Sequence, residues 1–314
     1  MKITGIKSTN PARKKEIYRK LSKALGGRLK TDVVLARYTT FGIGGKADLF
    51  YRATTPDQLI YTIRTAQKLN VRYLVLGGGS NILMSDSGFR GLIIKNECRN
   101  IVVNQNSITC QSGAWLDDVV KKACSSSLSG CEFAAGIPGT VGGAIRGNAG
   151  AFGKAVGDIL TRAVLLTSKG EIKEVKRDFF RFGYRESILK RNGDIVLSAT
   201  FGLKKRRPKE IEKQVKENIE KRRVNLPWKE RSAGCYFKNI IQGKKKISTG
   251  LLLDQIGAKG MQAGGAQVSR KHANILINVK NAKSADVKKL SSILKRMIKA
   301  KFNINLKEEV VYID

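Results

Sequence analysis

Histidine and cysteine, the side chains that most often bind transition metals, are scarce in this sequence of 314 residues. It contains one histidine and five cysteines, which are His272, Cys98, Cys110, Cys124, Cys131 and Cys235. No two cysteines form a C-x-x-C pair, and a single histidine cannot supply a nitrogen-rich zinc site. The sequence therefore predicts no metal site and no disulfide framework, and a cysteine taken alone is most often a small buried hydrophobe.

Long hydrophobic runs are also absent. A membrane-spanning helix requires about 18 or more consecutive apolar residues, and no such stretch occurs. Residues 1–30 carry lysine and arginine without a following apolar segment, so a secretory signal peptide is not expected either. We therefore expect a cytoplasmic protein without a membrane segment. With 41% apolar residues, the chain can still bury a sizeable core.

Acidic residues are few relative to basic ones. The chain has 60 Lys and Arg against 25 Asp and Glu, a formal net charge of +35, which exceeds what solubility requires. A nucleic-acid-binding protein is one alternative, but the basic residues are spread along the whole chain and no nucleic-acid-binding module is recognisable. We interpret the charge as a bias of composition or a general attraction to phosphates, without specific nucleic-acid binding.

The spacing of apolar residues predicts helices alternating with short strands. The helix after Thr55 is the best specified, because Thr55 can cap it, Pro56 suits its first position and Gln58 completes a capping box. The expected helices lie near residues 17–25, 56–66, 114–125, 211–219 and 284–298, and the expected strands near residues 33, 71–76, 91–94, 101–103, 107–110 and 310–313. Lys204–Arg207 has the composition of a solvated linker, so we expect a domain boundary there.

Two glycine-rich loops stand out. Residues 77–81 (GGGSN) directly follow the expected strand 71–76, where a backbone without side chains can bring its N–H groups close to an anion. Residues 130–150 are rich in Gly and Ala around Pro138, which favours a shaped backbone surface for a large ligand. The loops match neither the Walker A nor the Rossmann pattern. Together they suit a cofactor that contains a diphosphate, although the first loop alone could be a structural turn.

With these loops, the sequence resembles the UDP-N-acetylenolpyruvoylglucosamine reductases, the MurB family, from about residue 32 to residue 314. The segments that carry the resemblance are residues 38–45 (YTTFGIGG), 76–83 (LGGGSNIL), 136–144 (GIPGTVGGA), 148–150 (NAG), 184–187 (YRES), 232–239 (SAGCYFKN), 264–269 (GGAQVS) and 272–274 (HAN). The compact region between Ile195 and Arg222 is similar to the shorter subclass, because it leaves no room for the substrate-covering loop of the longer one.

The resemblance implies an α+β fold with a two-subdomain FAD-binding region of the vanillyl-alcohol-oxidase type and a C-terminal α+β substrate domain. The expected divisions are a basic helical segment at 1–30, FAD-binding subdomains at 31–95 and 96–203, and the substrate domain at 204–314. It also implies bound FAD, NADPH as co-substrate, and reduction of UDP-N-acetylglucosamine enolpyruvate to UDP-N-acetylmuramate in peptidoglycan synthesis. We expect a monomer.

Three catalytic residues are implied by matching positions. Arg185 matches the family arginine that contacts the enolpyruvyl carboxylate, and Glu309 matches the glutamate that stabilises the enolic intermediate, although Glu308 beside it leaves the register open by one residue. Cys235 stands where many members have a serine that donates a proton. A thiol is mostly protonated at neutral pH and is a stronger acid than an alcohol, so cysteine suits this role. A bidentate guanidinium likewise suits a carboxylate that gains charge.

The remaining expected site residues follow from the same motifs. The cofactor-binding residues are Leu76, Gly77, Gly78, Gly79, Ser80, Asn81, Ile82, Gly136, Ile137, Pro138, Gly139, Thr140, Gly142, Gly143 and Ala144. The substrate-binding residues are Tyr184, Arg222, Arg223, Lys238, Asn239 and His272, of which the cations and the amide suit a diphosphate. Departures from the family pattern are Lys46 and Ile240 in place of prolines, and Arg146–Gly147 in place of a bulkier apolar pair. A flavin oxidase on the same fold is the second enzymatic alternative.

Overall fold

The computed structural model describes residues 11–243 and 245–314, which form two compact units built from interleaved segments of the chain. The first unit contains the described residues up to Val33, together with Asp48–Gly78 and Arg90–Glu220. The second contains Val34–Ala47, Gly79–Phe89 and Lys221–Asp314. No helix in the described part of the chain is long and apolar enough to cross a membrane. The four-part division expected from the sequence stays a proposal.

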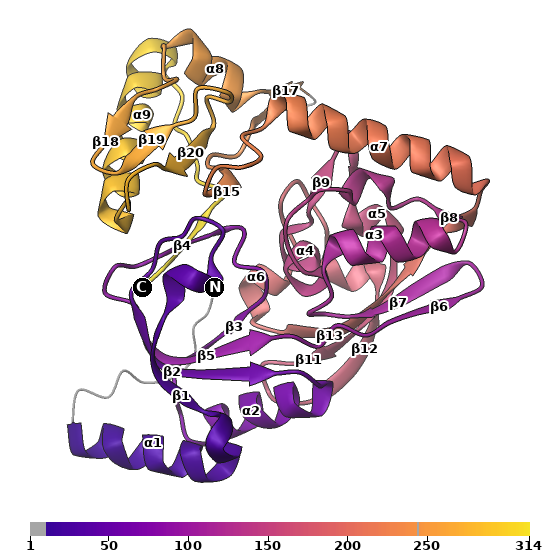
Figure 1. Cartoon of the computed structure of the whole chain (residues 1–314), viewed down its shortest axis with the longest axis vertical. Helices are drawn as coiled ribbons and strands as arrows, with labels where there is room; N and C mark the ends of the chain where they lie inside the picture. The colour runs from indigo at the N-terminus through magenta and orange to yellow at the C-terminus, as the bar shows by residue number, and fades with distance from the viewer. Residues whose placement is uncertain (1–10, 244) are drawn as a thin grey trace. The chain divides into compact units, whose positions relative to one another are not determined.

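One half of the first unit is a four-stranded sheet with two helices against it (Figure 1). The strand order is β1(Lys30–Val34), β2(Lys46–Ala53), β5(Phe89–Asn96), β3(Tyr73–Leu76), and β3 runs parallel to β5. Helices α1(Pro11–Leu25) and α2(Pro56–Lys68) contribute Leu21 and Ile63 to the core of this half. The predicted N-cap of α2 is confirmed, because the Thr55 hydroxyl accepts a hydrogen bond from the Gln58 backbone N–H at 3.3 Å. The predicted capping box is not formed, because the Gln58 side-chain oxygen accepts the N–H of Thr54 at 3.0 Å and not that of Thr55.

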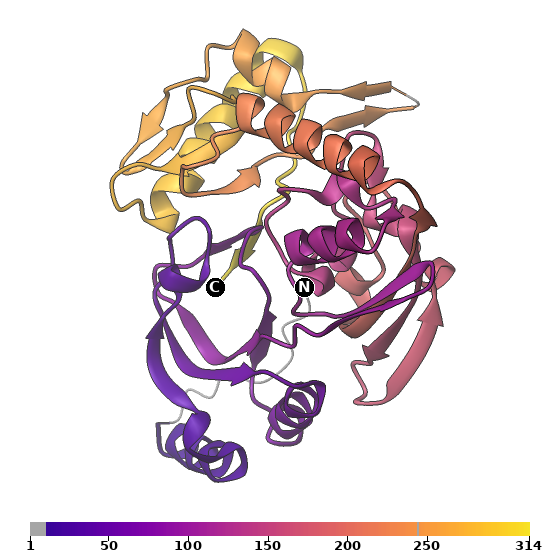
Figure 2. The ribbon, with the colours of Figure 1, turned by 45° about the vertical axis from the view of Figure 1, so that its right-hand side comes forward.

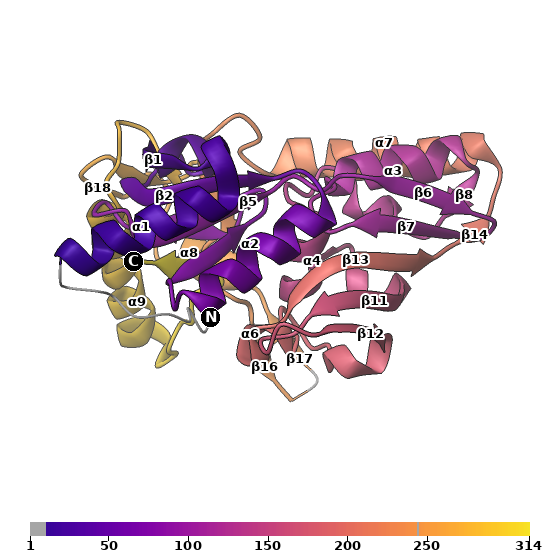
Figure 3. The same cartoon turned by 90° about the horizontal axis from the view of Figure 1, so that it is seen from below.

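The other half of the first unit is a five-stranded antiparallel sheet, whose strands lie side by side in Figure 3. Their order is β12(Ile172–Lys176), β11(Leu160–Leu166), β13(Ile195–Gly202), β7(Ser107–Gln111), β6(Ile101–Asn104). Helices α3(Leu116–Ser125) and α4(Val141–Gly147) share a core with it that includes Val120, Ile145 and Phe201. Shorter elements of the first unit are β8(Leu128–Ser129), β9(Gly150–Ala151), β10(Lys154–Ala155), α5(Val156–Ile159), α6(Leu189–Asn192) and the 3-10 turns at 26–28, 132–134 and 177–180, and a further 3-10 turn at 35–38 belongs to the second unit.

The expected linker at Lys204–Arg207 is in part regular structure. Lys204–Lys205 forms strand β14, which pairs with β8 while both lysine side chains stay exposed. Helix α7(Pro208–Asn225) follows, and the division between the two units falls inside it, between Glu220 and Lys221. The basic composition therefore predicted solvent exposure but missed the backbone pairing.

The second unit has a four-stranded antiparallel sheet in the order β15(Ser232–Cys235), β20(Ile275–Asn278), β19(Ala266–Val268), β18(Gln262–Ala263). Helix α9(Ser284–Phe302), yellow in Figure 2, packs along the orange strands β18 and β19, and its Leu290 and Leu294 are fully buried. The unit also contains α8(Thr249–Gln255), the hairpin β16(Ile240–Gln242) and β17(Lys245–Ile247), and the parallel pair β4(Ile82–Met84) and β21(Val311–Ile313).

Candidate active site

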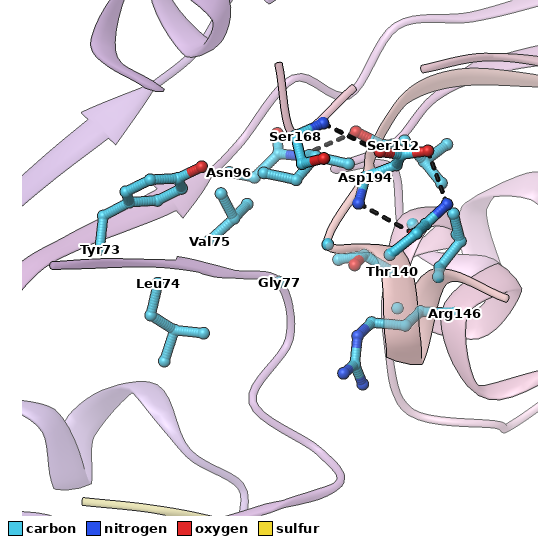
Figure 4. Close-up of a pocket in the computed structure, with 17 residues that line it drawn as sticks. Tyr73, Leu74, Val75, Gly77, Asn96, Ser112, Thr140, Arg146, Ser168 and Asp194 are labelled. Atoms are coloured by element: carbon cyan, nitrogen blue, oxygen red, sulfur yellow. Dashed lines mark hydrogen bonds between the residues drawn. The ribbon is translucent and has the colours of Figure 1, made fainter. Parts of the chain in front are cut away.

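A cavity of about 310 Å³ opens inside the first unit, between its two sheets (Figure 4). This volume lies within the range of small-molecule and cofactor sites. The residues around it come from β3, the end of β5, α4, α6, the start of β13 and the loops between them. They are Tyr73, Leu74, Val75, Gly77, Asn96, Ser112, Thr140, Gly142, Gly143, Arg146, Ser168, Leu189, Asn192, Gly193, Asp194, Ile195 and Val196. Both glycine-rich loops of the sequence therefore reach this cavity.

The two loops pack so closely that glycine is required where they meet. A Cβ atom added to Gly77 would lie 2.3 Å from Oγ1 of Thr140, and one added to Gly78 would lie 2.8 Å from the Trp115 ring. Real Cβ atoms do not approach other atoms that closely. Gly143 differs, because a Cβ there would meet only Thr140 Oγ1 within 4 Å, at 3.6 Å. Gly143 thus leaves free space beside the cavity.

A buried lysine fixes the first loop. Lys95, on β5 opposite Leu76, is 7% exposed, and its ammonium donates a hydrogen bond to the carbonyl oxygen of Gly77. Burial lowers the pKa of Lys95, and the nearby Glu97 carboxylate opposes this shift. The ammonium also lies 5.8 Å from the centre of the Trp115 ring. This cation therefore holds the turn that follows β3.

The second loop is held from the neighbouring sheet. The Gly142 N–H donates to the carbonyl oxygen of Ser112 at 2.8 Å, and the Ser112 hydroxyl accepts a hydrogen bond from the Asn96 amide at 2.8 Å. The Gly136 N–H donates to the Asp117 carboxylate at 2.7 Å. Gly136, Ile137, Pro138 and Gly139 precede α4, while Ala144 points into the core and is buried. The loop is thus preorganised before any ligand binds.

The remainder of the first glycine loop belongs to the second unit. Gly79 accepts a hydrogen bond at its carbonyl from the Thr40 N–H at 3.2 Å. The Asn81 side-chain amide donates to the carbonyl oxygen of Glu309 at 3.3 Å, and the Asn81 carbonyl accepts from the Val311 N–H at 3.0 Å. Ser80 and Ile82 lie in the same segment. Through Asn81, the first glycine loop is therefore hydrogen-bonded to the backbone of Glu309, the expected catalytic glutamate.

Arg185 lies in the first unit in an unusual backbone conformation. Its φ is 56°, in the left-handed region that few large side chains adopt. The guanidinium donates through Nη1 to the carbonyl oxygen of Gly150 at 3.1 Å, and its carbon lies 5.8 Å from the centre of the Tyr184 ring. Residues held in sparsely populated backbone conformations cluster at functional sites. The left-handed backbone and the guanidinium held by Gly150 are features expected of a functional arginine, although Arg181 also has a positive φ.

Cys235 and Glu309 lie close together in the second unit. Cys235 ends β15, and the carbonyl oxygen of the next residue, Tyr236, accepts the Glu309 N–H at 2.8 Å. Cys235 is partly exposed, whereas three other cysteines are buried thiols, and burial raises the pKa of Cys98 to about 11 and the pKa of Cys110 and Cys131 to about 12. The partly exposed Cys124 is the fifth.

The two neighbouring glutamates, Glu308 and Glu309, have different contacts in the structure. Glu308 pairs with the Lys295 ammonium and lies opposite Phe237 in an isolated bridge, so it serves the packing of α9. Glu309 is the one whose backbone joins Tyr236 and Asn81. The geometry therefore supports the register in which Glu309 has the catalytic role, which stays a proposal.

The expected substrate contacts of the second unit are partly used within the protein. The Asn239 side-chain oxygen accepts the Thr249 N–H at 3.1 Å, and the Lys238 N–H donates to the carbonyl oxygen of Lys307 at 2.8 Å. His272 is half-buried, and its Nδ1 accepts the Asn274 N–H at 3.2 Å. Arg222 and Arg223 lie in the last turn of α7.

Comparison with known proteins decides the family. Residues 226–313 match the family model described as UDP-N-acetylenolpyruvoylglucosamine reductase, C-terminal domain, and residues 47–176 match an FAD binding domain. UDP-N-acetylenolpyruvoylglucosamine reductase 2 of Bacillus anthracis is 36% identical over 300 residues, covering 94% of this chain and 96% of that protein. The chain belongs to the UDP-N-acetylenolpyruvoylglucosamine reductase family.

Other relatives agree with this assignment. The Clostridium tetani reductase is 35% identical over 301 residues, covering 95% of this chain and 97% of that protein. The crystal structure of the MurB reductase from Thermus caldophilus superimposes with a TM-score of 0.78 at 31% identity, covering 91% of this chain and all of that one. The predicted α+β fold with an FAD-binding region is therefore confirmed, and the chain is an FAD-dependent oxidoreductase.

The cavity has the features that FAD requires. The glycine loops offer backbone surface without side chains, Gly143 borders free space, and the lining combines apolar with polar groups. Of the expected cofactor residues, Gly77, Thr140, Gly142 and Gly143 line it. The sequence prediction missed the lining residues of β3, those at 189–196, and Asn96, Ser112 and Ser168, because ordinary strand and turn residues carry no ligand signature. For Arg146, the sequence indicated only a departure from the family pattern and no role in cofactor binding.

Proposed function

We propose that this chain reduces UDP-N-acetylglucosamine enolpyruvate to UDP-N-acetylmuramate with NADPH, a step of peptidoglycan synthesis. Full-length similarity to named reductases supports this substrate. Arg185, Cys235 and Glu309 stand where the motif resemblance expects the catalytic residues, which favours the same reaction over an oxidase reaction. The chemistry that FAD supplies when bound is hydride acceptance from NADPH and hydride delivery to the enolpyruvyl methylene carbon.

Each of the three residues has a separate task in this proposal. The Arg185 guanidinium pairs with the substrate carboxylate and stabilises the charge that develops there when the methylene carbon gains a hydride. The Cys235 thiol then gives its proton to the neighbouring carbon, and solvent restores the thiol. Glu309 stabilises the enolic intermediate between these steps. The product keeps the ether oxygen and the carboxylate, and only one carbon–carbon double bond is reduced.

The remaining expected residues would bind the substrate's nucleotide part. Arg222, Arg223 and Lys238 are cations suited to the uridine diphosphate, and Asn239 and His272 offer polar groups in the same unit. Tyr184 would contact the substrate beside Arg185. We also propose that the enzyme is cytoplasmic and monomeric.

An anaerobic absorbance experiment tests the function directly. Addition of NADPH to the purified flavoprotein should bleach the flavin band, and addition of UDP-N-acetylglucosamine enolpyruvate should restore it. Bleaching without recovery would mean that the flavin and the reductant are right but the substrate is wrong. A protein that takes up no flavin even from added FAD would refute the proposal altogether.

Matched cysteine variants test the proton donor. Cys235→Ala should leave bleaching by NADPH unchanged and slow recovery with substrate by roughly 10²- to 10⁴-fold, the range typical of a lost general acid. Cys235→Ser should recover faster than Cys235→Ala, because a hydroxyl can still donate. Cys124→Ala removes the other partly exposed thiol and should behave as wild type. Normal recovery in Cys235→Ala would remove Cys235 from the mechanism.

A further inference from the structure

Arg146 is a cation in the cofactor cavity that no protein group neutralises directly. It lies on α4, one helical turn after Gly142 and Gly143, and all three residues line the cavity. Figure 4 shows its side chain extending away from the hydrogen-bonded group around Ser112 and Asp194. Within residues 11–243 and 245–314, its guanidinium has no hydrogen bond and no ion pair. Burial lowers the pKa of Arg146, which the more distant Glu186 opposes.

The other charged groups of this region are already satisfied. Asp194, the acidic residue of the cavity lining, accepts the Ser168 N–H at 2.9 Å and the Asn192 amide at 2.7 Å. Lys95 donates to the Gly77 carbonyl oxygen. A partly desolvated guanidinium without a counter-ion is costly, and an anionic ligand would offset that cost. Among the charged groups of this lining, Arg146 is therefore the one that an anionic ligand would stabilise.

We propose that Arg146 binds the diphosphate of FAD. The proposal rests on the FAD-binding function above and adds to it a side chain that departs from the family pattern. The diphosphate carries the negative charge of oxidised FAD, and a guanidinium can bind two of its oxygens at once. A backbone N–H of the neighbouring glycine loops is a weaker, neutral donor, and those of Gly136 and Gly142 are already donated within the protein. In this chain a full positive charge therefore supplements the backbone in holding the cofactor.

Three variants of the full-length flavoprotein test this role. Arg146→Met keeps most of the side-chain volume without the charge, and Arg146→Lys keeps the charge without the planar fork. Arg162→Met removes one positive charge from an exposed ion pair with Glu174 in the same unit, away from the cavity, and is the matched control. The readouts are the FAD dissociation constant at low and high salt, from flavin fluorescence, and the midpoint potential of the bound flavin.

The expected result is an FAD dissociation constant raised on the order of 10- to 100-fold in Arg146→Met, by analogy with other charge-assisted hydrogen bonds. Arg146→Lys should lie between this variant and wild type, and Arg162→Met should match wild type. The salt dependence of binding should flatten in Arg146→Met.

Two results would overturn the proposal. FAD affinity equal to wild type in Arg146→Met, with an altered midpoint potential, would place the guanidinium at the flavin ring instead. Wild-type values of both quantities would exclude contact with the cofactor. Neither result bears on the proposed reductase function, which fails if the wild-type protein takes up no FAD or if UDP-N-acetylglucosamine enolpyruvate does not restore its flavin band.

Discussion

Lys190 donates a hydrogen bond from its ammonium group to the backbone carbonyl oxygen of Arg185, at a distance of 2.5 Å. The same ammonium lies 3.8 Å from a carboxylate oxygen of Glu186, and the lysine side chain is only 19% exposed. Arg185 has a positive φ, which costs free energy for a residue with a side chain. Lys190 thus helps to hold the backbone from which the proposed carboxylate-binding guanidinium projects.

This relationship predicts that Lys190 positions Arg185 without touching the substrate. Lys190→Met should lower kcat/KM for the enolpyruvyl substrate by roughly 10- to 100-fold, the effect of a small misplacement of a catalytic group. Stopped-flow absorbance should show normal flavin reduction by NADPH and slow reoxidation by substrate. Lys169→Met, at an exposed turn of the same unit, is the control. Equal loss in both half-reactions would indicate a general folding defect instead.

The glycines of α4 and of the first loop should respond differently to a methyl group. Gly143→Ala meets no close protein atom and favours the helix, so the flavin-free protein should be as stable as wild type or more stable. If FAD packs against this helix, its dissociation constant should still rise by about tenfold or more, because the methyl group occupies ligand space.

Gly77→Ala provides the contrast to Gly143→Ala. Its methyl group would collide with Thr140, so both flavin binding and the thermal midpoint of the flavin-free protein should fall. Thermal unfolding and fluorescence titration of the two variants separate these effects. Unchanged FAD affinity in Gly143→Ala would show that the cofactor does not contact this face of α4.

Local signals in the sequence specified the elements well. The capping residues around Thr55 predicted α2, and the apolar spacing after Ser284 predicted α9, because these patterns act within one helix. The glycine loops could be assigned to a cofactor, because a backbone without side chains can approach a ligand closely. These features needed no knowledge of distant contacts.

The pairing of strands that lie far apart in the chain could not be predicted from the sequence. Nothing local in residues 79–89 indicates that they join the C-terminal part of the chain, where Ile82–Met84 pairs in parallel with Val311–Ile313. Strand β14 likewise exists only because β8 lies beside it. The cavity lining from residues 189–196 depends on how α6 and β13 are placed, which single-residue patterns do not encode.

Asp86 should stabilise the second unit through the start of α9. Its carboxylate accepts the Ser284 N–H at 2.8 Å, the Ser284 hydroxyl at 2.7 Å and the Ala285 N–H at 3.2 Å. Asp86→Ala should lower the free energy of unfolding by about 1–3 kcal/mol, because helix N-terminal donors lose a charged partner. Chemical denaturation measures this loss. The control is Asp57→Ala, at an exposed first-turn position of α2, which should cost less.

His272 should make the stability of the protein sensitive to acid. Burial lowers its pKa below the ordinary value near 6.5, and Nδ1 accepts the Asn274 N–H, which a protonated ring cannot do. The Asn274 amide in turn donates to the Phe237 carbonyl oxygen at 2.8 Å, within the segment that follows Cys235. Protonation of His272 therefore opposes the folded arrangement beside the proposed proton donor.

The sign of the pH effect follows from that shift. Between the unfolded pKa and the lower folded pKa, the unfolded chain binds more protons, so the stabilising contribution of neutral His272 is complete above about pH 6.5 and declines as the pH falls further. His272→Gln removes this titration, so its thermal midpoint should fall less than that of wild type between neutral and mildly acidic pH. Parallel curves for the two proteins would contradict the prediction and show that His272 titrates alike in the folded and unfolded states.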